Sequence, residues 1–140
     1  FGSYRPDLFE PHRATDILTT LLNAQEDYVD LWLAETITSI EEAQIIASVL
    51  KGSSKPCYYA FTLSDEIEQP ASLRSGELVT DAILDNIDGI FFNCSIPEVI
   101  EQAIRDTTCI LSKHNRQLDI GAFANSFVPI PKDHKANLNV

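Results

Sequence analysis

A cysteine that directly follows a predicted buried strand is the residue of this chain best suited to chemistry. Cys94 comes after Asn93 and the apolar run 87–92, and a predicted helix start follows it at residues 95–98. Parallel α/β folds keep their reactive groups at the carboxyl ends of strands, and a thiolate there is a natural zinc ligand. One thiolate does not make a zinc site, so the groups at the neighbouring strand ends matter equally.

Polar residues also follow the other three predicted strands. They are Glu35 after the first strand, Thr62 with Asp65 nearby after the second, and Asn125 with Ser126 after the fourth. If the strands are parallel, their carboxyl ends share one edge of the sheet. These groups would then face one site, which is the layout of an active site.

Each of these residues also has a purely structural interpretation. A cysteine beside an apolar strand is commonly a packing residue, a glutamate can cap a backbone amide, and Asn-Ser is an ordinary turn pair. Cys57 and Cys109 lie away from the predicted reactive ends, so we interpret them as core or half-buried thiols. The three histidines have no spacing that suggests a metal site and are expected on the surface.

Four apolar segments rich in β-branched and aromatic residues supply the predicted strands. They span residues 29–34, 57–62, 87–92 and 118–124. Their spacing of about 30 residues is the length of one βαβ unit. This regularity predicts strands that alternate with helices.

Four amphipathic helices are predicted around these strands. The first begins after Pro11, and the second starts at a capping box in which Ser39 and Glu42 each satisfy a free backbone N–H. The third spans about 75–86, and the fourth starts at a second capping box over residues 95–98.

Alternating strands and helices indicate a parallel sheet covered by helices, either an open doubly wound sheet or a barrel. No Gly-rich phosphate loop follows any strand, which argues against a nucleotide-binding open sheet. A complete barrel needs about 250 residues. The expected fold class is therefore α/β, a partial (β/α)8 TIM barrel of about four parallel βα units in one domain over residues 1–140.

The composition of the chain limits which classes of molecule it can bind. The 140 residues carry 10 basic and 21 acidic side chains, and the resulting charge of −11 repels nucleic acid and anionic membrane surfaces. No apolar run approaches the roughly 20 residues that span a bilayer. Three cysteines are a poor match to a disulfide framework. We therefore expect a soluble, cytoplasmic protein with reduced thiols.

Several short motifs follow one another along the chain. They are Gly2-Ser3-Tyr4, Phe9-Glu10-Pro11-His12-Arg13, Leu33-Ala34-Glu35-Thr36-Ile37 with Glu41-Glu42-Ala43, Ala60-Phe61-Thr62-Leu63, Phe92-Asn93-Cys94 and Ala124-Asn125-Ser126. Single motifs are weak signals, but in this order and spacing they resemble the homocysteine S-methyltransferase family across nearly the whole chain. The likeness is closest to the branch that uses S-methylmethionine or S-adenosylmethionine.

The resemblance implies a zinc-dependent methyl transfer from a sulfonium donor to homocysteine, giving methionine. In the family, three cysteine thiolates and the homocysteine sulfur bind zinc at the carboxyl mouth of the barrel. Cys94 would be the first zinc ligand, and Glu35 would hold the amino group of homocysteine by a charge-assisted hydrogen bond. Asn93 would shape the cysteine loop, and Asn125 and Ser126 would line the pocket. No residue is assigned a catalytic role.

The chain departs from the family pattern in its cysteines. The family's other two zinc ligands are an adjacent cysteine pair near the last barrel strand, and no Cys-Cys occurs here. The first strands and that last strand are absent, so the chain resembles the middle half of a barrel. Residues 1–4 read as the tail of a strand and the segment after Phe127 as loop. Zinc binding would need two further cysteines, and this segment alone is expected to be inactive.

Two other functions stay open. A non-catalytic half-barrel module would self-associate, or pair with another chain, through its exposed strand edges. Another barrel enzyme, such as a lyase, would use Glu35 as acid or base. The lack of an obvious lysine or phosphate site at the strand ends argues against that enzyme.

Overall fold

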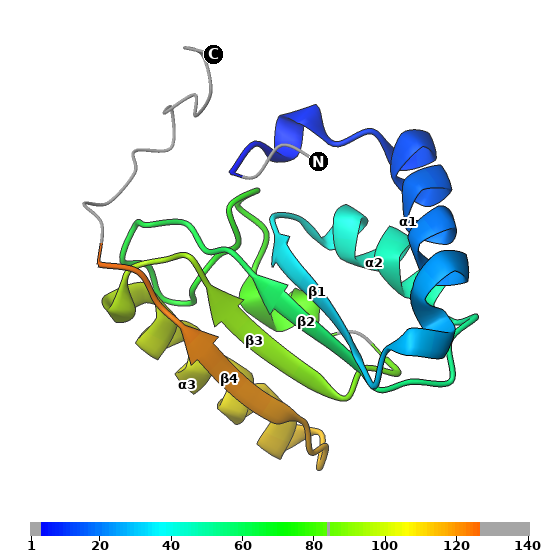
Figure 1. The fold of residues 1–140 in the computed structure, drawn as a ribbon. Coiled ribbons are helices and arrows are strands. Elements are labelled where there is room, and N and C mark those ends of the chain that lie inside the picture. The colour runs from blue at the N-terminus through cyan, green and yellow to red at the C-terminus, as the bar shows by residue number, and fades with distance from the viewer. Residues whose placement is uncertain (1–3, 84, 127–140) are drawn as a thin grey trace.

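Four parallel strands form one sheet in the order β1-β2-β3-β4 (Figure 1). This computed structural model describes residues 4–83 and 85–126, so the predictions for residues 1–3 and for the loop after Phe127 lie outside the described residues. The strands alternate with helical segments, which confirms the α/β class and matches part of a (β/α)8 barrel. The strands are β1 (Trp32–Ile37), β2 (Cys57–Phe61), β3 (Gly89–Asn93) and β4 (Asp119–Phe123).

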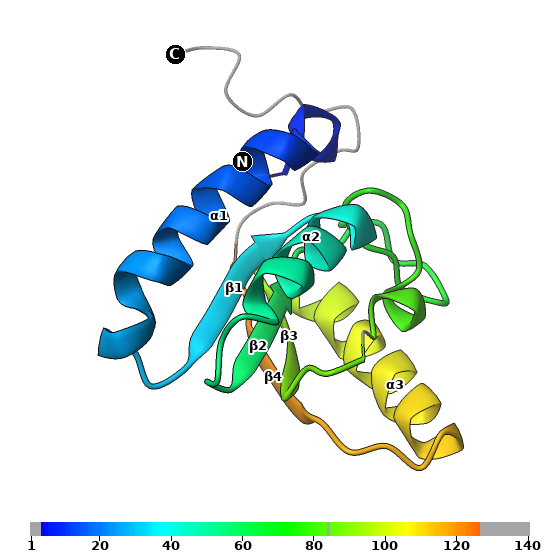
Figure 2. The same ribbon diagram turned by 90° about the vertical axis from the view of Figure 1, so that its right-hand side faces the viewer.

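Within the described residues, three α-helices and three short 3-10 turns accompany the sheet. In Figures 1 and 2, α1 lies at the β1 side of the molecule beside α2, and α3 lies at the opposite side. The helices are α1 (Pro11–Gln25), α2 (Ile40–Leu50) and α3 (Pro97–Lys113), and the 3-10 turns are η1 (Pro6–Leu8), η2 (Glu26–Tyr28) and η3 (Val79–Ala82).

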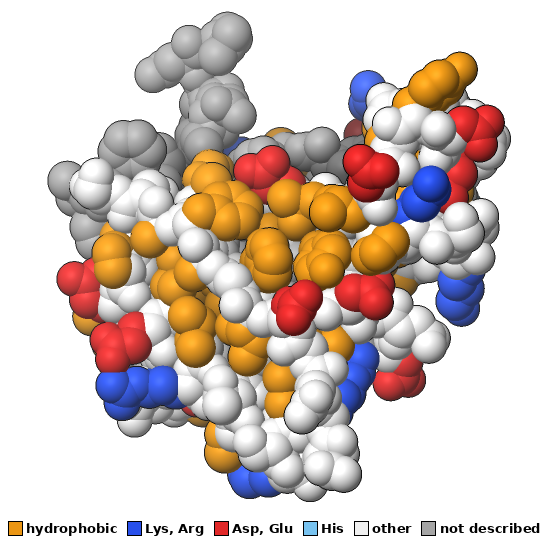
Figure 3. Space-filling model, turned by 60° about the horizontal axis from the view of Figure 1, so that its bottom comes forward, with side chains coloured by type: hydrophobic (Ala, Val, Ile, Leu, Met, Phe, Trp, Pro, Cys, Tyr) orange, Lys and Arg blue, Asp and Glu red, His pale blue; other side chains and the backbone are white. Residues whose placement is uncertain are grey.

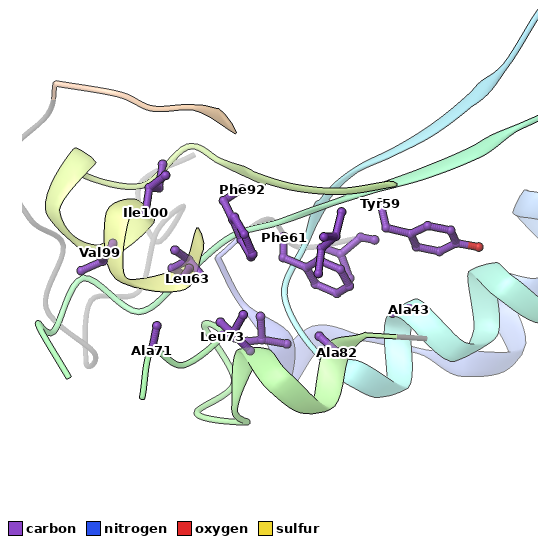
Figure 4. Packing of buried hydrophobic residues seen from close by; sticks show 14 of the residues in the cluster. Ala43, Tyr59, Phe61, Leu63, Ala71, Leu73, Ala82, Phe92, Val99 and Ile100 are labelled. Atoms are coloured by element: carbon purple, nitrogen blue, oxygen red, sulfur yellow. The ribbon is translucent and has the colours of Figure 1, made fainter. Parts of the chain in front are cut away.

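The side chains on one face of the sheet form the hydrophobic core with the helices. Figure 4 shows Tyr59 and Phe61 of β2 and Phe92 of β3 pointing away from the strands toward Ala43 of α2 and Ala82 of η3. All five are nearly inaccessible to solvent. Burying aromatic side chains of this size supplies the largest apolar contribution to stability.

The serine half of the first predicted capping box is confirmed. The Ser39 hydroxyl accepts a hydrogen bond from the Glu42 amide at 3.2 Å and starts α2. The Glu42 carboxylate bonds instead to the amide and hydroxyl of Thr38, at 2.9 and 3.0 Å. It therefore fixes the end of β1 as well as the start of the helix.

The second predicted capping box is wrong. Helix α3 begins at Pro97 after Ile96, without a side-chain cap. The Ser95 hydroxyl is buried, where it donates to the carbonyl of Asn93 at 3.0 Å and accepts from the amide of Leu63 at 2.9 Å. Ser95 thus joins the ends of β2 and β3 instead of capping a helix.

The predicted third helix is also wrong, because the described residues between 75 and 86 form the short 3-10 turn η3 and no α-helix. Backbone amides here bond to distant backbone groups. Val79 N donates to Ala71 O of the same loop, and Ser75 N donates to Thr38 O at the end of β1, each at 3.0 Å. The Glu77 carboxylate accepts from Ile40 N at 2.8 Å. These tertiary bonds replace the bonds of an α-helix.

Strand β1 lies three residues later than predicted. The turn η2 occupies residues 26–28, and pairing with β2 begins where Trp32 N donates to Pro56 O at 2.9 Å. The register with β2 shifts between Ala34 and Ile37, and Thr36 in this bulge has a φ of 60°. Glu35 is therefore inside β1, beside a bulge, and does not follow the strand.

The carboxylate of Glu26 ties the start of β1 to the loop after α2. It accepts hydrogen bonds from Trp32 Nε1 at 2.9 Å, from the Ser53 hydroxyl at 2.8 Å and from the Ser54 amide at 3.0 Å. The bond from Trp32, and then those from Ser53 and Ser54, lower the pKa of Glu26. The ionised form of Glu26 is consequently the form that stabilises the fold.

We predict that Glu26→Gln lowers stability at neutral pH and weakens the acid sensitivity of the fold. A lowered folded-state pKa contributes stability above the unfolded value, and that contribution is lost as the pH falls below about 4. The urea midpoints of wild type and variant, read from the single tryptophan Trp32, should differ at pH 7 and converge in acid. Asp27→Asn, an exposed neighbour, is the matched control. A difference that stays constant with pH would contradict this role for Glu26.

Candidate functional site

The carboxyl ends of the four strands meet at one edge of the sheet because every strand pair is parallel. Ala34 pairs with Tyr59, which faces the helices, so Glu35 lies on the opposite face. By the same alternation Asn93 follows Phe92 onto that face. Glu35 and Asn93 therefore share both the edge and the face of the sheet.

The carboxamide of Asn93 is the centre of this edge and is fully buried. Its Nδ2 donates to the Thr36 hydroxyl at 2.9 Å and to the Cys94 sulfur at 3.3 Å. Its Oδ1 accepts from the Thr62 hydroxyl at 3.5 Å. One amide thus contacts the ends of β1 and β2 and the cysteine that follows β3.

Cys94 occupies a tight turn directly after β3. Its φ is 51°, its amide donates to Phe123 O at 3.2 Å, and its side chain is half-buried. Its carbonyl accepts from the Tyr4 hydroxyl at 3.4 Å. Burial, together with the adjacent Cys94, raises the pKa of Tyr4 to about 12, so this phenol stays protonated and can donate.

A buried ion pair between Arg74 and Asp65 lies next to Tyr4. Arg74 Nη1 lies 3.5 Å from the Asp65 carboxylate, and both side chains are less than a tenth exposed. The guanidinium carbon of Arg74 lies 5.4 Å from the centroid of the Tyr4 ring, which is within range of a cation–π interaction. This arrangement holds Tyr4 over the turn at Cys94.

Glu35 is exposed and lines a cavity of about 260 Å³ that lies at the outer edge of β1, beside α1 and α2, where side chains of both sheet faces reach it. Arg5 and Thr36 also lie in its wall, and the rest of the lining is mainly apolar. Arg5 Nε donates to Asp7 at 2.7 Å, so the Arg5 side chain is held in place at the cavity wall. A carboxylate beside an apolar hollow can accept hydrogen bonds from the ammonium group of an amino acid.

Asn125 and Ser126 follow β4 at the same edge. The Asn125 amide donates to Ser95 O at 3.0 Å, which fixes the backbone at that point. The Asn125 side chain is half-buried, and Ser126 is exposed. Both residues are therefore placed near the turn that holds Cys94.

Within residues 4–83 and 85–126, no group of three or more His, Cys, Asp or Glu side chains could hold a metal ion. Cys57 is buried at the start of β2, the opposite end of the sheet from Cys94, and burial raises the pKa of its thiol. Cys109 is exposed on α3, so the prediction of a half-buried thiol is wrong for it. The donors present do not make up a zinc site of the family type.

Neither of the two described histidines adds a donor to this edge. His12 and His114 are exposed, as expected, and His134 lies outside the part of the chain that the structure describes. In the same part of the chain, no helix is both long and apolar enough to cross a bilayer.

Sequence reasoning did not single out Tyr4, Thr36 or Arg74 as members of the site. Tyr4 and Thr36 belong to motifs noted above, but nothing in the amino-acid sequence indicates their hydrogen bonds. Arg74 comes from a loop that was predicted to lead into a helix. Its contact with Tyr4 depends on how residues 62–78 fold back over the sheet edge.

Comparison with known proteins agrees with this geometry. The family model described as homocysteine S-methyltransferase matches residues 3–139. Comparison with curated protein sequences gives no match. Because the family match spans nearly the whole sequence, and the parallel βα units are those of part of a barrel, the chain belongs to the homocysteine S-methyltransferase family.

Proposed function

We propose that this chain forms part of an enzyme that transfers a methyl group from a sulfonium donor, S-methylmethionine or S-adenosylmethionine, to homocysteine. The observation that carries the proposal is the position of Glu35 and Cys94 at the same carboxyl edge of a parallel sheet. The three free cysteines fit a cytoplasmic setting, where thiols stay reduced.

In this proposal the residues bind and orient homocysteine. The Glu35 carboxylate accepts hydrogen bonds from the substrate ammonium group, and Asn125 with Ser126 lines the pocket. Asn93 fixes the turn that presents Cys94. The homocysteine thiol releases its proton to solvent and its sulfur bonds to the methyl carbon. The donor S–CH3 bond breaks at the same time, and its electron pair stays on the donor sulfur, which becomes a neutral thioether.

The family's zinc requirement sets a limit on what this chain does alone. Cys94 is the one thiol at the substrate edge among the residues described, because Cys57 and Cys109 lie elsewhere. A zinc site of the family type would need two more thiolates from outside these 140 residues. We therefore propose that the segment binds homocysteine weakly and has no methyltransferase activity by itself.

We predict that homocysteine shifts the amide NMR signals of residues near Glu35 and Cys94 in the isolated chain. Glu35→Gln should weaken this binding about tenfold, the loss expected for one charge-assisted hydrogen bond. Glu41→Gln, an exposed acid on α2, should bind like wild type. No methionine should form when zinc and either donor are added.

Two results would contradict different parts of this proposal. Homocysteine that shifts no signal at the strand edge, or binds the Glu35→Gln variant equally well, would remove the substrate assignment. Methionine production by the chain alone would instead disprove its inactivity while supporting the reaction. A methyl donor that yields the product would also identify the branch of the family.

A second candidate function, a self-associating half-barrel, is favoured by a face of the sheet that no described helix covers. Figure 3 shows apolar side chains gathered on this side of the molecule with acidic side chains among them. Leu33 and Phe123 on this face are each 40% exposed, and Tyr58 packs on Phe91 with ring centroids 5.5 Å apart. Parallel sheets are ordinarily covered on both faces, so this surface favours association.

Each of the two outer strands of the sheet, β1 and β4, has one edge that could pair with another strand. Among the strands that the structure describes, β1 pairs with β2 alone, and the cavity beside α1 lies at the other edge of β1. In the same described part of the chain, β4 pairs with β3 alone, and on its helix side Ile120 is half-buried and Ala122 is exposed. Pairing β4 of one copy with β1 of another, twice, would close a ring of eight parallel strands.

We predict a concentration-dependent dimer that strengthens with salt. Each copy carries a charge of −11, and the Debye length falls from about 10 Å at 0.1 M to about 3 Å at 1 M, which weakens repulsion between copies. Leu33→Lys should shift sedimentation equilibrium toward monomer. Ile67→Lys, which alters an apolar side chain outside the sheet, should not. A monomer at all concentrations and salts would exclude this function.

A further inference from the structure

Two residues at the sheet edge have left-handed backbone conformations, and each adjoins a residue proposed to face the substrate. Thr36, with a φ of 60°, directly follows Glu35, and Cys94 itself has a φ of 51°. A β-branched residue such as threonine adopts this conformation only when its surroundings impose it. The path of the chain at both positions is therefore set by contacts with other strands.

A single buried amide connects these two turns. Both Nδ2 hydrogens of Asn93 are used, one by the Thr36 hydroxyl at 2.9 Å and the other by the Cys94 sulfur at 3.3 Å. Asn93 is fully buried, so water cannot replace either partner. The orientation of the Cys94 side chain is thereby coupled to the bulge in β1.

The Thr36 bond is the shorter and better formed of the two threonine contacts. Thr62 donates to Asn93 Oδ1 at 3.5 Å, the limit for a hydrogen bond, whereas the Thr36 contact has the ideal length. In this contact the Thr36 hydroxyl accepts, which fits the orientation in which the amino group of Asn93 also lies beside the Cys94 sulfur. Without this contact, the amide could rotate and present its oxygen to the sulfur.

We propose that Thr36 is a positioning residue, whose hydroxyl acts through the Asn93 amide to hold the Cys94 thiol in a fixed orientation relative to Glu35. The functional meaning of that orientation rests on the proposed homocysteine site. The link itself is a property of the folded chain, and it is measurable without substrate or metal.

The experiment is alkylation of the native chain by iodoacetamide, with the rate at each cysteine measured by mass spectrometry. The three thiols act as separate reporters in one sample. Exposed Cys109 measures reagent activity, buried Cys57 measures global opening, and Cys94 measures the turn at the site. Thr36→Val removes the acceptor at nearly constant volume, and Thr36→Ser retains it.

We expect Thr36→Val to change the Cys94 rate, relative to Cys109, about fivefold, the effect of losing one buried hydrogen bond. The Cys57 rate should stay at its wild-type value, and Thr36→Ser should restore the Cys94 rate. Thr108→Val, which changes a threonine on the exposed side of α3, is the control and should leave all three rates unaltered.

Several results would overturn the positioning role. They are an unchanged Cys94 rate in Thr36→Val, a Cys57 rate that rises in parallel with that of Cys94, and failure of Thr36→Ser to restore the rate. If Thr36→Val does not fold, hydrogen–deuterium exchange on the wild-type chain tests the proposal instead. The side-chain amide hydrogens of Asn93 should then exchange slowly. Rapid exchange would disprove the bridge. Loss of homocysteine binding would affect only the proposed function.

Discussion

The parallel pairing of all four strands is the constraint on which the rest of the structure depends. Parallel neighbours need a crossover between them, so each connection leaves the sheet and returns over one face. The helices and the turn η3 consequently cover that face and bury the aromatic side chains of β2 and β3. The same pairing brings every carboxyl end to one edge, where Glu35 and Cys94 are found.

This edge is built from contacts between strands that are distant in sequence. The amide of Asn93 lies between the ends of β1 and β2, and Ser95 joins the Asn93 carbonyl to the amide of Leu63. A buried carboxamide without partners would be costly, so the register of the strands and the identity of these residues depend on each other. The loop over residues 62–78 adds the Arg74–Asp65 pair, which supports Tyr4 above the cysteine turn.

Much of the framework could be predicted from sequence because it follows from local patterns. The apolar segments located β2, β3 and β4 to within about two residues, and the serine cap at Ser39 located the start of α2. The helix predicted over residues 75–86 failed because backbone groups there bond to a loop and to the end of β1. Periodicity cannot show such long-range bonds, and the same limit explains why Ser95 was taken for a cap.

The sequence suggested some of the residues proposed for the site, but it did not indicate the geometry of the strand edge. No sequence pattern marks a threonine with positive φ, and two such backbone positions, at Thr36 and Cys94, cost about 1–3 kcal/mol each. One hydrogen bond to Asn93 returns only about 0.5–1.5 kcal/mol, so it cannot hold both turns. The sheet must do so, through bonds such as Cys94 N to Phe123 O and Thr62 N to Ile37 O. Strand pairing therefore fixes the backbone at this edge, and the amide is left to select the direction in which the thiol points.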